Sequence, residues 1–586
     1  MHTRQGYQFY IICFLLLSVC VIVSLPILQA GYFSDDIINS LIPGTLKIYQ
    51  QGFWHYICEY MQVWMTYGRF FPLSIISTVS IFYLFPDVHH YQIIRLLFIW
   101  LSILGFAWLI KLLSKNNWTV MLFLFITPLC WSMRDIPDPL TSFAVFLPLV
   151  SFFISTSLIT FLYYQRTKKT FWLSLSLLLY TFALASYEVG IVTLFLIIVL
   201  SLFEPINKWW QSLKPYLLIT LVYIGVYVLL QKMSPAVYDG IQISMNARFF
   251  EIGFAQLSSA FPLSYILLAS DVPFSSQHIL KSAFQQPDQL LLMSYLFFTA
   301  LIGFYALLNK ATLTLKNIIC FLSLGLTLLF IPACLIALSQ KYQSIVTPGK
   351  GYIPVYIQYM GATFILLAGL AWLNVSKWPY QKSLRAGLAF IMSSILVITV
   401  IFNLALVQIK NEKYSYKRLL LENALQHGLL SALPTQVTIV EKLNLWNNHD
   451  FYAIHTPKNL ENVIDINDFK KFTLEKVQRG QIYYLDMQRV PQTPHGFVLI
   501  GQIKNFQTKR LTHELQVSRL IEIRNPIIYI SAQNEFELNQ LIHELQLRLH
   551  LQQNALEAIV HTYHLSSQKW LIVKNIKGIY QLPIIY

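Results

Sequence analysis

Two adjacent carboxylates, Asp35 and Asp36, occur in the sequence GYFSDDIIN, a few residues after a long apolar run. Ionisable groups are costly in or beside a lipid bilayer, so each one found there needs a physical reason. A carboxylate in this position could accept a proton from a hydroxyl group, hold a divalent cation, or be solvated at a helix end. The pair alone is compatible with all three roles.

The same segment continues as FWHYICEYMQVWMTYGRFFPL and ends in Tyr67-Gly68-Arg69. Aromatic side chains at this density are typical of a helix in the membrane interface. Arg69 could bind a phosphate in two-pronged fashion, or it could reach toward water from an interfacial anchor. His55 and Arg248 are weaker candidates, and a single His in an aromatic segment is more often a structural hydrogen-bond donor.

Three further ionisable groups lie in short segments between apolar runs. Arg134 and Asp138, in the sequence RDIPDP, could bind substrate at the membrane surface or pair with neighbours in a Pro-rich turn. Glu188 is the only acidic residue between residues 139 and 203. A buried carboxylate is costly unless it is paired or protonated. We therefore interpret Glu188 as a site residue for a metal ion, a phosphate-binding cation or a sugar hydroxyl.

The segment SQKYQSIVTPGKGYIPVYIQY carries Lys341 and Lys350 among glycines and tyrosines. Lysines beside a flexible turn can neutralise a lipid phosphate, and Tyr352 and Tyr356 can hydrogen-bond to phosphate or stack on a sugar ring. The alternative is a basic surface loop with interfacial tyrosines. We favour phosphate binding, because this loop is expected on the outer face, where basic loops are uncommon.

The elements that must position these groups are membrane helices. Of the 586 residues, 56% are hydrophobic and 12% charged, against about 25% charged in soluble proteins. Residues 1–408 contain 34 charged side chains and residues 409–586 contain 35. This excludes a single soluble globular fold and predicts a membrane domain over 1–408, followed by a soluble domain over 409–586. The net charge of +15 lies largely in short loops, which indicates membrane topology rather than nucleic-acid binding.

Eleven runs are apolar enough to be membrane spans, and we expect 11 or 12 in total. They lie near residues 9–29, 91–112, 118–131, 141–165, 171–187, 189–203, 215–231, 290–308, 318–339, 355–374 and 386–408. A twelfth run, 71–86, is short for a crossing. Polar residues interrupt another run, 252–269, which we expect to lie along the outer surface.

Basic residues in alternate loops predict the orientation, because Lys and Arg collect on the cytoplasmic side. Five loops can be cytoplasmic together; they contain Lys111, Arg166, Lys214, Lys310 and Arg385. If run 71–86 spans, the N-terminus is outside and the loop 31–70 is cytoplasmic. If it does not, the N-terminus is inside and the loop is extracytoplasmic, with interfacial helices. We favour the second arrangement. The five basic loops by themselves place the soluble domain outside.

The soluble domain is predicted to be α/β or α+β. A helix is expected over 412–431 and another over 536–562, and strands are expected in QVTIVEKL, QIYYLDM, GFVLIGQI, SRLIEIR, PIIYIS and KWLIVKNI. No phosphate loop, nucleophile elbow or dinucleotide fingerprint is present. The six cysteines all precede residue 409 and form no metal-binding pattern.

Together, a first helix, an Asp-bearing outer loop, the Gly-Arg and Pro-Leu stretch near residues 68–73, many further spans and a terminal domain resemble the GT-C superfamily of membrane glycosyltransferases. The resemblance is best over residues 31–75. It implies a catalytic Asp in the first outer loop, here Asp35 or Asp36, and a sugar donor carried on a polyprenyl phosphate or diphosphate. It also implies that Asp138 is similar in placement to an acidic residue found after the fourth helix.

The reaction implied is displacement at the anomeric carbon of the lipid-linked sugar by an acceptor hydroxyl, with inversion. Cations should stabilise the phosphate leaving group, and Arg69, Lys341 and Lys350 are the candidates. A divalent ion is compatible with this chemistry, but no set of residues has convincing metal-ligand spacing. The expected partners are the donor lipid and a glycan, lipid or protein acceptor, and the expected location is the bacterial plasma membrane.

Three alternatives remain open on the sequence. An O-antigen-type polymerase or ligase would rely on outer-loop arginines, which are sparse here. A lipid-linked glycan transporter or flippase would carry ionisable residues near mid-membrane. Apart from Arg95, which lies near the end of its run, the apolar runs are nearly free of charged residues. A scaffold without catalysis would leave Asp35 replaceable.

Overall fold

The structure is a computed structural model. It describes residues 2–586 except for 144, 204–208, 235–237, 273–286, 376–379, 427–428, 431–432, 435, 442–450, 453, 455–459, 466–480, 492, 494, 512–513, 533, 550–568, 577–578 and 582–586. The chain forms two compact units. The first comprises Met1–Asp36 and Trp54–Gln408, and the second comprises Ile37–Phe53 and Ile409–Tyr586. Residues Ile37–Phe53, which lie within the expected outer loop 31–70, belong to the second unit.

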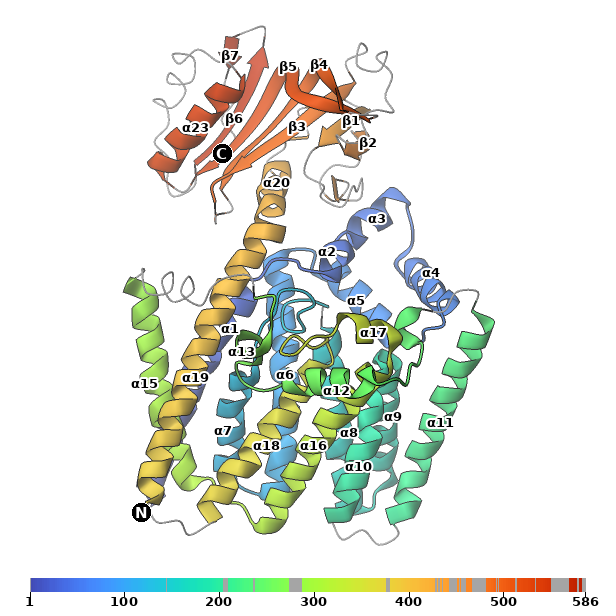
Figure 1. Cartoon of the computed structure of the whole chain (residues 1–586), viewed down its shortest axis with the longest axis vertical. Coiled ribbons are helices and arrows are strands. Elements are labelled where there is room, and N and C mark those ends of the chain that lie inside the picture. Colours follow the sequence, from blue (N-terminus) through green and yellow to red (C-terminus); the bar gives the residue numbers. More distant parts are fainter. Residues whose placement is uncertain are drawn as a thin grey trace. The chain divides into compact units, whose positions relative to one another are not determined.

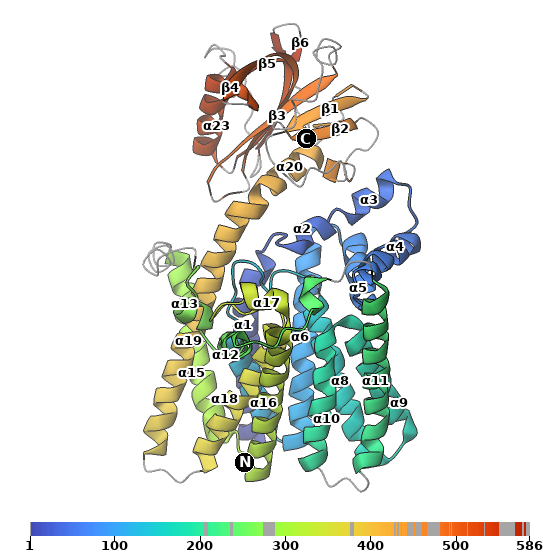
Figure 2. The same cartoon turned by 45° about the vertical axis from the view of Figure 1, so that its right-hand side comes forward.

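The first unit is a bundle of apolar helices (Figures 1 and 2). Within the described residues, eight helices are long and apolar enough to cross a membrane, and four shorter ones are also apolar. In chain order these helices are α1 (His2–Leu28), α5 (Pro72–Leu84), α6 (Val88–Ser114), α7 (Asn117–Ile126, extended by a 3-10 turn, Thr127–Cys130), α8 (Phe146–Thr167), α9 (Thr170–Ser186), α10 (Val192–Phe203), α11 (Trp209–Met233), α15 (Pro287–Lys310), α16 (Leu315–Leu338), α18 (Val355–Val375) and α19 (Gln381–Lys410). The protein is therefore an integral membrane protein.

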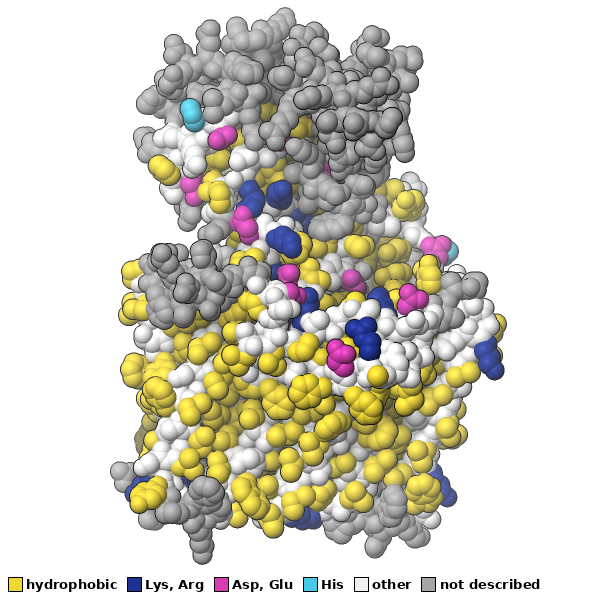
Figure 3. All heavy atoms as spheres, viewed as in Figure 1, with side chains coloured by type: hydrophobic (Ala, Val, Ile, Leu, Met, Phe, Trp, Pro, Cys, Tyr) yellow, Lys and Arg dark blue, Asp and Glu magenta, His cyan; other side chains and the backbone are white. Residues whose placement is uncertain are grey.

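The basic connections lie on one face of the bundle. Arg166 donates to the carbonyl of Leu112 at 2.8 Å, and Asn116 donates to the carbonyl of Thr312 at 3.2 Å. Arg385 likewise binds Asn309, at 2.9 Å. Figure 3 shows Lys and Arg side chains along the lower rim of the first unit, below a broad apolar band, whereas side chains of both charges occur at the upper edge of the band. We call this rim the basic face.

The other connections share the opposite face. Arg134 donates to the carbonyl of Ser259 at 2.6 Å, and Arg69 pairs with Glu188 at 3.3 Å. Short surface helices occupy this face: α4 (Phe53–Thr66), α12 (Arg248–Ser258), α13 (Ser264–Leu268) and α17 (Gln340–Ile345). The run 252–269 thus forms α12 and α13, as expected for a segment that does not cross.

Helix α5 begins and ends on this opposite face. Arg69, which precedes it, binds Glu188, and Pro86, which follows it, accepts a hydrogen bond of 2.7 Å from Tyr32 at the end of α1. Eleven described helices therefore cross the bundle, which puts the start of α1 and the end of α19 on different faces.

Close helix packing and local caps set the bundle geometry. Gly325 of α16 and Gly361 of α18 face one another, and a Cβ on either would lie 2.8 Å from the other's carbonyl oxygen. Small residues permit this approach of membrane helices. Asp87 caps α6 by accepting from the backbone N–H groups of His89 and His90. These caps fix where the chain turns at each face.

The second unit contains short helices and one mixed sheet. Its helices are α3 (Ile42–Ile48), α20 (Tyr416–Gln426) and α23 (Glu535–Leu549), and its strands are β1 (Val437–Glu441), β2 (Leu460–Asp465), β3 (Ile482–Arg489), β4 (Gly496–Leu511), β5 (Glu514–Ala532), β6 (Lys569–Ile576) and β7 (Ile579–Gln581). The sheet order is β2-β1-β3-β4-β5-β6-β7, with parallel pairs on both sides of β1 and antiparallel pairs thereafter. The predicted fold class, a membrane helix bundle followed by a mixed α/β domain, is confirmed.

The predicted strands differ from the structure in two ways. The runs SRLIEIR and PIIYIS, which we had expected to be separate, form the single strand β5, and β2 and β7 were not predicted. The end of the predicted helix 536–562 lies outside the described residues. The core of this unit includes Leu41 together with Leu420, Ile439, Leu485 and Ile500.

We expect the basic face to be cytoplasmic and residue 410 to be extracytoplasmic, because Lys and Arg resist translocation. A reporter that is active only outside the cytoplasm should be active when fused after residue 410. The same reporter fused after residue 168, in a basic loop, should be inactive. The reverse pattern of activity would contradict this orientation.

Candidate functional site

The two adjacent carboxylates, Asp35 and Asp36, lie in different environments. Both begin helix α2 (Asp35–Asn39). Asp36 is fully buried, and its carboxylate accepts hydrogen bonds from Tyr91, at 2.5 Å, and from Arg95, with which it forms an ion pair. Asp35 has an exposed side chain. Only Asp35 is therefore open to a solute, and Asp36 is engaged with α6.

The outer turn of α6 holds the chain that leads into α2. The side-chain amide of Gln92 donates to the carbonyls of Ala30 and Gly31, at 2.9 and 3.0 Å, and its oxygen accepts from Arg95 at 3.2 Å. Gln92 and Arg95 are both buried. A buried ion pair is stable only when its charges are matched and hydrogen-bonded. These contacts explain why α6 carries Arg95 inside a membrane helix.

Asp35 has a perturbed carboxyl group. Desolvation by the surrounding protein raises its pKa above the ordinary value, and a hydrogen bond from Ser34 and the charge of Lys341 act in the opposite direction. The hydroxyl oxygen of Ser34 lies 3.5 Å from Oδ1 of Asp35. A raised pKa makes a carboxylate a stronger base, and such groups are enriched at functional sites.

Lys341 connects Asp35 to a cluster of aromatic side chains. It follows the first residue of α17, and its Nζ donates to the hydroxyl of Tyr238 at 2.6 Å while lying 4.5 Å from the centre of that ring. The next residue, Tyr342, packs on Tyr352, with ring centres 4.1 Å apart. Of the residues predicted from this loop, Lys341 and Tyr352 therefore lie in the cluster.

Arg69 reaches the same cluster from the turn between α4 and α5. Gly68 has φ +76°, a conformation that favours glycine, and a Cβ there would meet Ser234 Oγ at 3.3 Å. The guanidinium lies 4.5 Å from the ring centre of Phe71 and 5.1 Å from that of Tyr238. Its Nε is buried and has no hydrogen-bond partner among the described residues.

Glu188 pairs with Arg69 from the turn between α9 and α10. It begins a short 3-10 helix, Glu188–Ile191, and one carboxylate oxygen accepts from both Arg69, at 3.3 Å, and the hydroxyl of Tyr227 on α11. Its side chain is 26% exposed, against 13% for that of Arg69. The ion pair with Arg69 is therefore compatible with the predicted role of Glu188, which is to orient a phosphate-binding cation.

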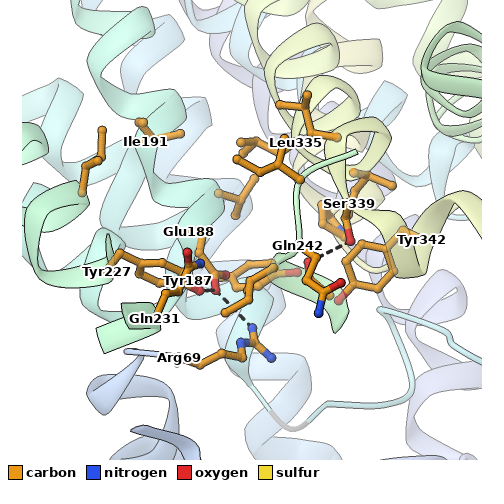
Figure 4. Close-up of a pocket in the computed structure, with 18 of the residues that line it drawn as sticks. Arg69, Tyr187, Glu188, Ile191, Tyr227, Gln231, Gln242, Leu335, Ser339 and Tyr342 are labelled. Carbon is orange, nitrogen blue, oxygen red and sulfur yellow. Dashed lines mark hydrogen bonds and ion pairs between the residues drawn. The ribbon is translucent and has the colours of Figure 1, made fainter. Parts of the chain in front are cut away.

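Arg69, Glu188 and Tyr342 line one end of a pocket of about 320 Å³. Figure 4 shows Arg69 and Glu188 at one end of the pocket, and Ile191 and Leu335 at the other. The polar residues of the lining include Arg69, Glu188, Tyr187, Tyr223, Tyr227 and Tyr342. The hydroxyl of Tyr223 is buried without a hydrogen-bond partner among the described residues.

The opposite end of the pocket is apolar. Its walls come from the turn before α10, from α11 and from α16, and include Ile191, Ile224, Val228, Leu335 and Ile336. Ile224 and Val228 have exposed side chains, so this wall of the pocket is accessible. The pocket therefore joins a cationic and aromatic end to an apolar wall of membrane helices.

The remaining predicted residues lie elsewhere. Arg134 is fully buried and donates to the backbone carbonyls of Ser259 and Lys350. Asp138 is also buried, and accepts from the N–H of Leu140 and the hydroxyl of Thr141. Lys350 forms an ion pair with Asp271. The contacts of Arg134 and Lys350 therefore join separate loops of this face, and those of Asp138 stabilise its own turn.

The weaker candidates also lie apart from the cluster. Tyr356 is buried and its hydroxyl shares a hydrogen bond of 2.7 Å with Ser102. His55 lies 3.0 Å from Glu59 on exposed turns of α4, and Arg248 begins α12. Within the described residues, no group of three or more His, Cys, Asp or Glu side chains could hold a metal ion.

Sequence reasoning missed the tyrosines that complete the pocket. Tyr223 and Tyr227 are four residues apart on α11, so they lie on one face of that helix. Two tyrosine hydroxyls at this spacing in an otherwise apolar span could have indicated a polar site from the sequence alone. Tyr187 directly precedes Glu188, and Tyr238 lies in a loop with no distinguishing pattern.

No protein-family model matches the sequence, and no curated protein matches it. Among solved structures, the chain is similar to the crystal structure of ArnT from Cupriavidus metallidurans bound to undecaprenyl phosphate. The TM-score is 0.39 and the sequence identity 12%, over 84% of this chain and 98% of that one. A likeness at this level assigns neither a family nor an activity to the chain.

Proposed function

We propose that this protein is a membrane glycosyltransferase that moves a hexosyl or pentosyl group from a polyprenyl-phosphate-linked donor to an acceptor hydroxyl on the extracytoplasmic face of the bacterial plasma membrane. The observation that carries the proposal is the pocket, in which Arg69 and the tyrosines stand at one end of an apolar wall formed by membrane helices. A lipid with an anionic head group and a long hydrocarbon chain has this division of polarity.

The cations would act on the leaving group. As the bond between the anomeric carbon and the phosphate oxygen breaks, negative charge grows on the phosphate, and fixed positive charges stabilise it most strongly. Arg69 is held between Glu188 and three aromatic rings, and Lys341 by Tyr238. Both would meet the phosphate with little reorganisation. In this proposal Arg134, Asp138 and Lys350 hold the surrounding loops.

Asp35 would act on the acceptor. Its carboxylate takes the proton of the acceptor hydroxyl while the hydroxyl oxygen forms its bond to the anomeric carbon, and the polyprenyl phosphate leaves from the opposite side. A single displacement of this kind inverts the sugar configuration. Glu188 would keep Arg69 oriented, and Tyr223 and Tyr227 could receive sugar hydroxyls or phosphate oxygens. A divalent ion is not required for these steps.

Substituting the two aspartates should have different effects. We expect Asp35→Asn to lower transfer by about 10²- to 10⁴-fold, the range for loss of a general base, with normal protein levels. Asp36→Asn should instead destabilise the fold by about 3–5 kcal/mol, because Arg95 is left buried without its counter-charge. Release of polyprenyl phosphate from a panel of polyprenyl-phosphate sugars measures the first effect, and membrane abundance and thermal unfolding measure the second.

If the Asp35→Asn variant releases polyprenyl phosphate at the wild-type rate, Asp35 has no catalytic role. A transporter would give a third result, namely movement of the lipid-linked sugar across vesicles without release of polyprenyl phosphate. Asp87→Asn is a suitable control, since Asp87 is an exposed carboxylate on the same face that caps α6.

Lys341 should tune the pH dependence of the reaction. Its charge lowers the pKa of Asp35, so Lys341→Met should raise that pKa further. Because the base must be deprotonated, activity is lost as the pH falls through this pKa, and the acid limb of kcat/KM should move to higher pH. Lys341→Arg should keep the limb in place. An unchanged acid limb in Lys341→Met would show that Asp35 does not control it.

Arg69→Lys should lower kcat/KM for the donor, although the substitution keeps the positive charge. Lysine keeps the charge but cannot stack as a planar group among three rings while bonding to Glu188. We expect kcat/KM for the donor to fall at least about tenfold, corresponding to one charged hydrogen bond. Arg248→Lys, at an exposed position of α12, should leave it unchanged, and equal values for the two variants would argue against a role for Arg69.

A further inference from the structure

A short segment after α11, residues 238–244, lies between the two turns that carry Arg69 and Lys341. We call it the bridging segment; it belongs, with both turns, to the first unit. At its start, the backbone N–H of Tyr238 donates to the carbonyl of Tyr67, two residues before Arg69, at 3.1 Å. This end of the bridging segment is therefore fixed to the turn between α4 and α5.

The rest of the bridging segment is fixed to the start of α17. The hydroxyl of Ser339 donates to the carbonyl of Gly240 at 2.7 Å, and the N–H of Gln340 donates to the carbonyl of Gln242 at 3.0 Å. Gln340 directly precedes Lys341, and Gly240 and Gln242 also line the pocket. Two turns that are distant in the chain are thus joined through one wall of the pocket.

The side chain of Tyr238 contacts the cation of each turn. Its hydroxyl accepts from Nζ of Lys341 at 2.6 Å, and its ring centre lies 4.5 Å from that atom and 5.1 Å from Cζ of Arg69. The edge of the ring packs on Trp64, with ring centres 6.0 Å apart. Because an aromatic face attracts a cation, one ring stabilises both positive charges.

Two cations beside one ring repel each other, so their placement needs compensating partners. Glu188 pairs with Arg69, and the charge of Lys341 acts on Asp35. A phosphate group reached by both cations would reduce the repulsion further and would accept charged hydrogen bonds from each. Donors that are already in place stabilise a developing charge without reorganisation, which makes the spacing of the two cations important.

We infer that Tyr238 is a positioning residue, which sets the spacing of Arg69 and Lys341 so that both cations act on one phosphate group. The inference rests on the proposed function of these two cations. The ring holds both charges, whereas the hydroxyl holds Lys341 alone. The bridging segment keeps the ring between the two turns.

Removing the ring and removing the hydroxyl should have different effects in the full-length protein. Tyr238→Leu should lower kcat/KM for the polyprenyl-phosphate sugar about tenfold, because both cations lose a ring contact. Tyr238→Phe keeps the ring and should keep kcat/KM within about threefold of the wild-type value. Membrane abundance of each variant shows whether the protein is made at normal levels.

The loss of the hydroxyl should be visible in the pH dependence. Desolvation raises the pKa of Asp35 and the charge of Lys341 lowers it; Tyr60 and Tyr352 also interact with Asp35. Burial raises the pKa of both tyrosines, so they stay neutral in the acid range. In Tyr238→Phe the ammonium group is held less firmly, and the pKa of Asp35 should rise. The acid limb of kcat/KM should therefore move to higher pH, by less than in Lys341→Met.

A double variant and a second tyrosine serve as controls. In a Lys341→Met background, Tyr238→Phe should leave the acid limb where it is, since the hydroxyl acts through Lys341. Tyr164 is half-buried on α8 near the basic face, and Nζ of Lys168 lies 5.8 Å from its ring centre. Tyr164→Phe and Tyr164→Leu should change neither kcat/KM nor the acid limb.

The outcomes separate this inference from the proposed function. Wild-type kcat/KM and acid limb in both Tyr238 variants, alongside losses in Arg69→Lys and Asp35→Asn, would overturn the positioning role and leave the transferase proposal standing. Equal losses in the Tyr238 and Tyr164 variants would also overturn it, by pointing to general damage. Wild-type donor use by Arg69→Lys would overturn the proposed role of the cations, and this inference with it.

Discussion

The buried ion pair of Asp36 and Arg95 is the interaction on which the candidate site depends. A charge in a membrane helix is tolerated only when it is matched, and here the match lies in the first residues after α1. The pair thereby fixes where the chain leaves the first helix. Asp35 directly precedes Asp36, so the position of its exposed carboxylate is set by its buried neighbour. One acidic residue secures the fold, and the other is left open to a solute.

At the cationic end of the pocket a charged side chain is also paired, but its pairing is less complete. Arg69 shares Glu188 with Tyr227, and the side chain of Glu188 is partly exposed. A charge that is held by rings and one carboxylate remains able to bind an anion. The fully enclosed Arg134, by contrast, donates to two backbone carbonyls and serves the loops around it. The difference in enclosure, rather than the residue type, distinguishes the two arginines.

Local features of the sequence predicted the bundle of apolar helices, because membrane helices depend on the density of apolar residues. They could not predict partners that are distant in the chain. Lys341 and Lys350 have similar neighbours in sequence, yet one binds Tyr238 and the other Asp271. Nor could they predict that Ile37–Phe53 belongs to the second unit, because Leu41 would suit an interfacial helix equally well. The pairing of Arg69 with Glu188, 119 residues apart, likewise follows only from the fold.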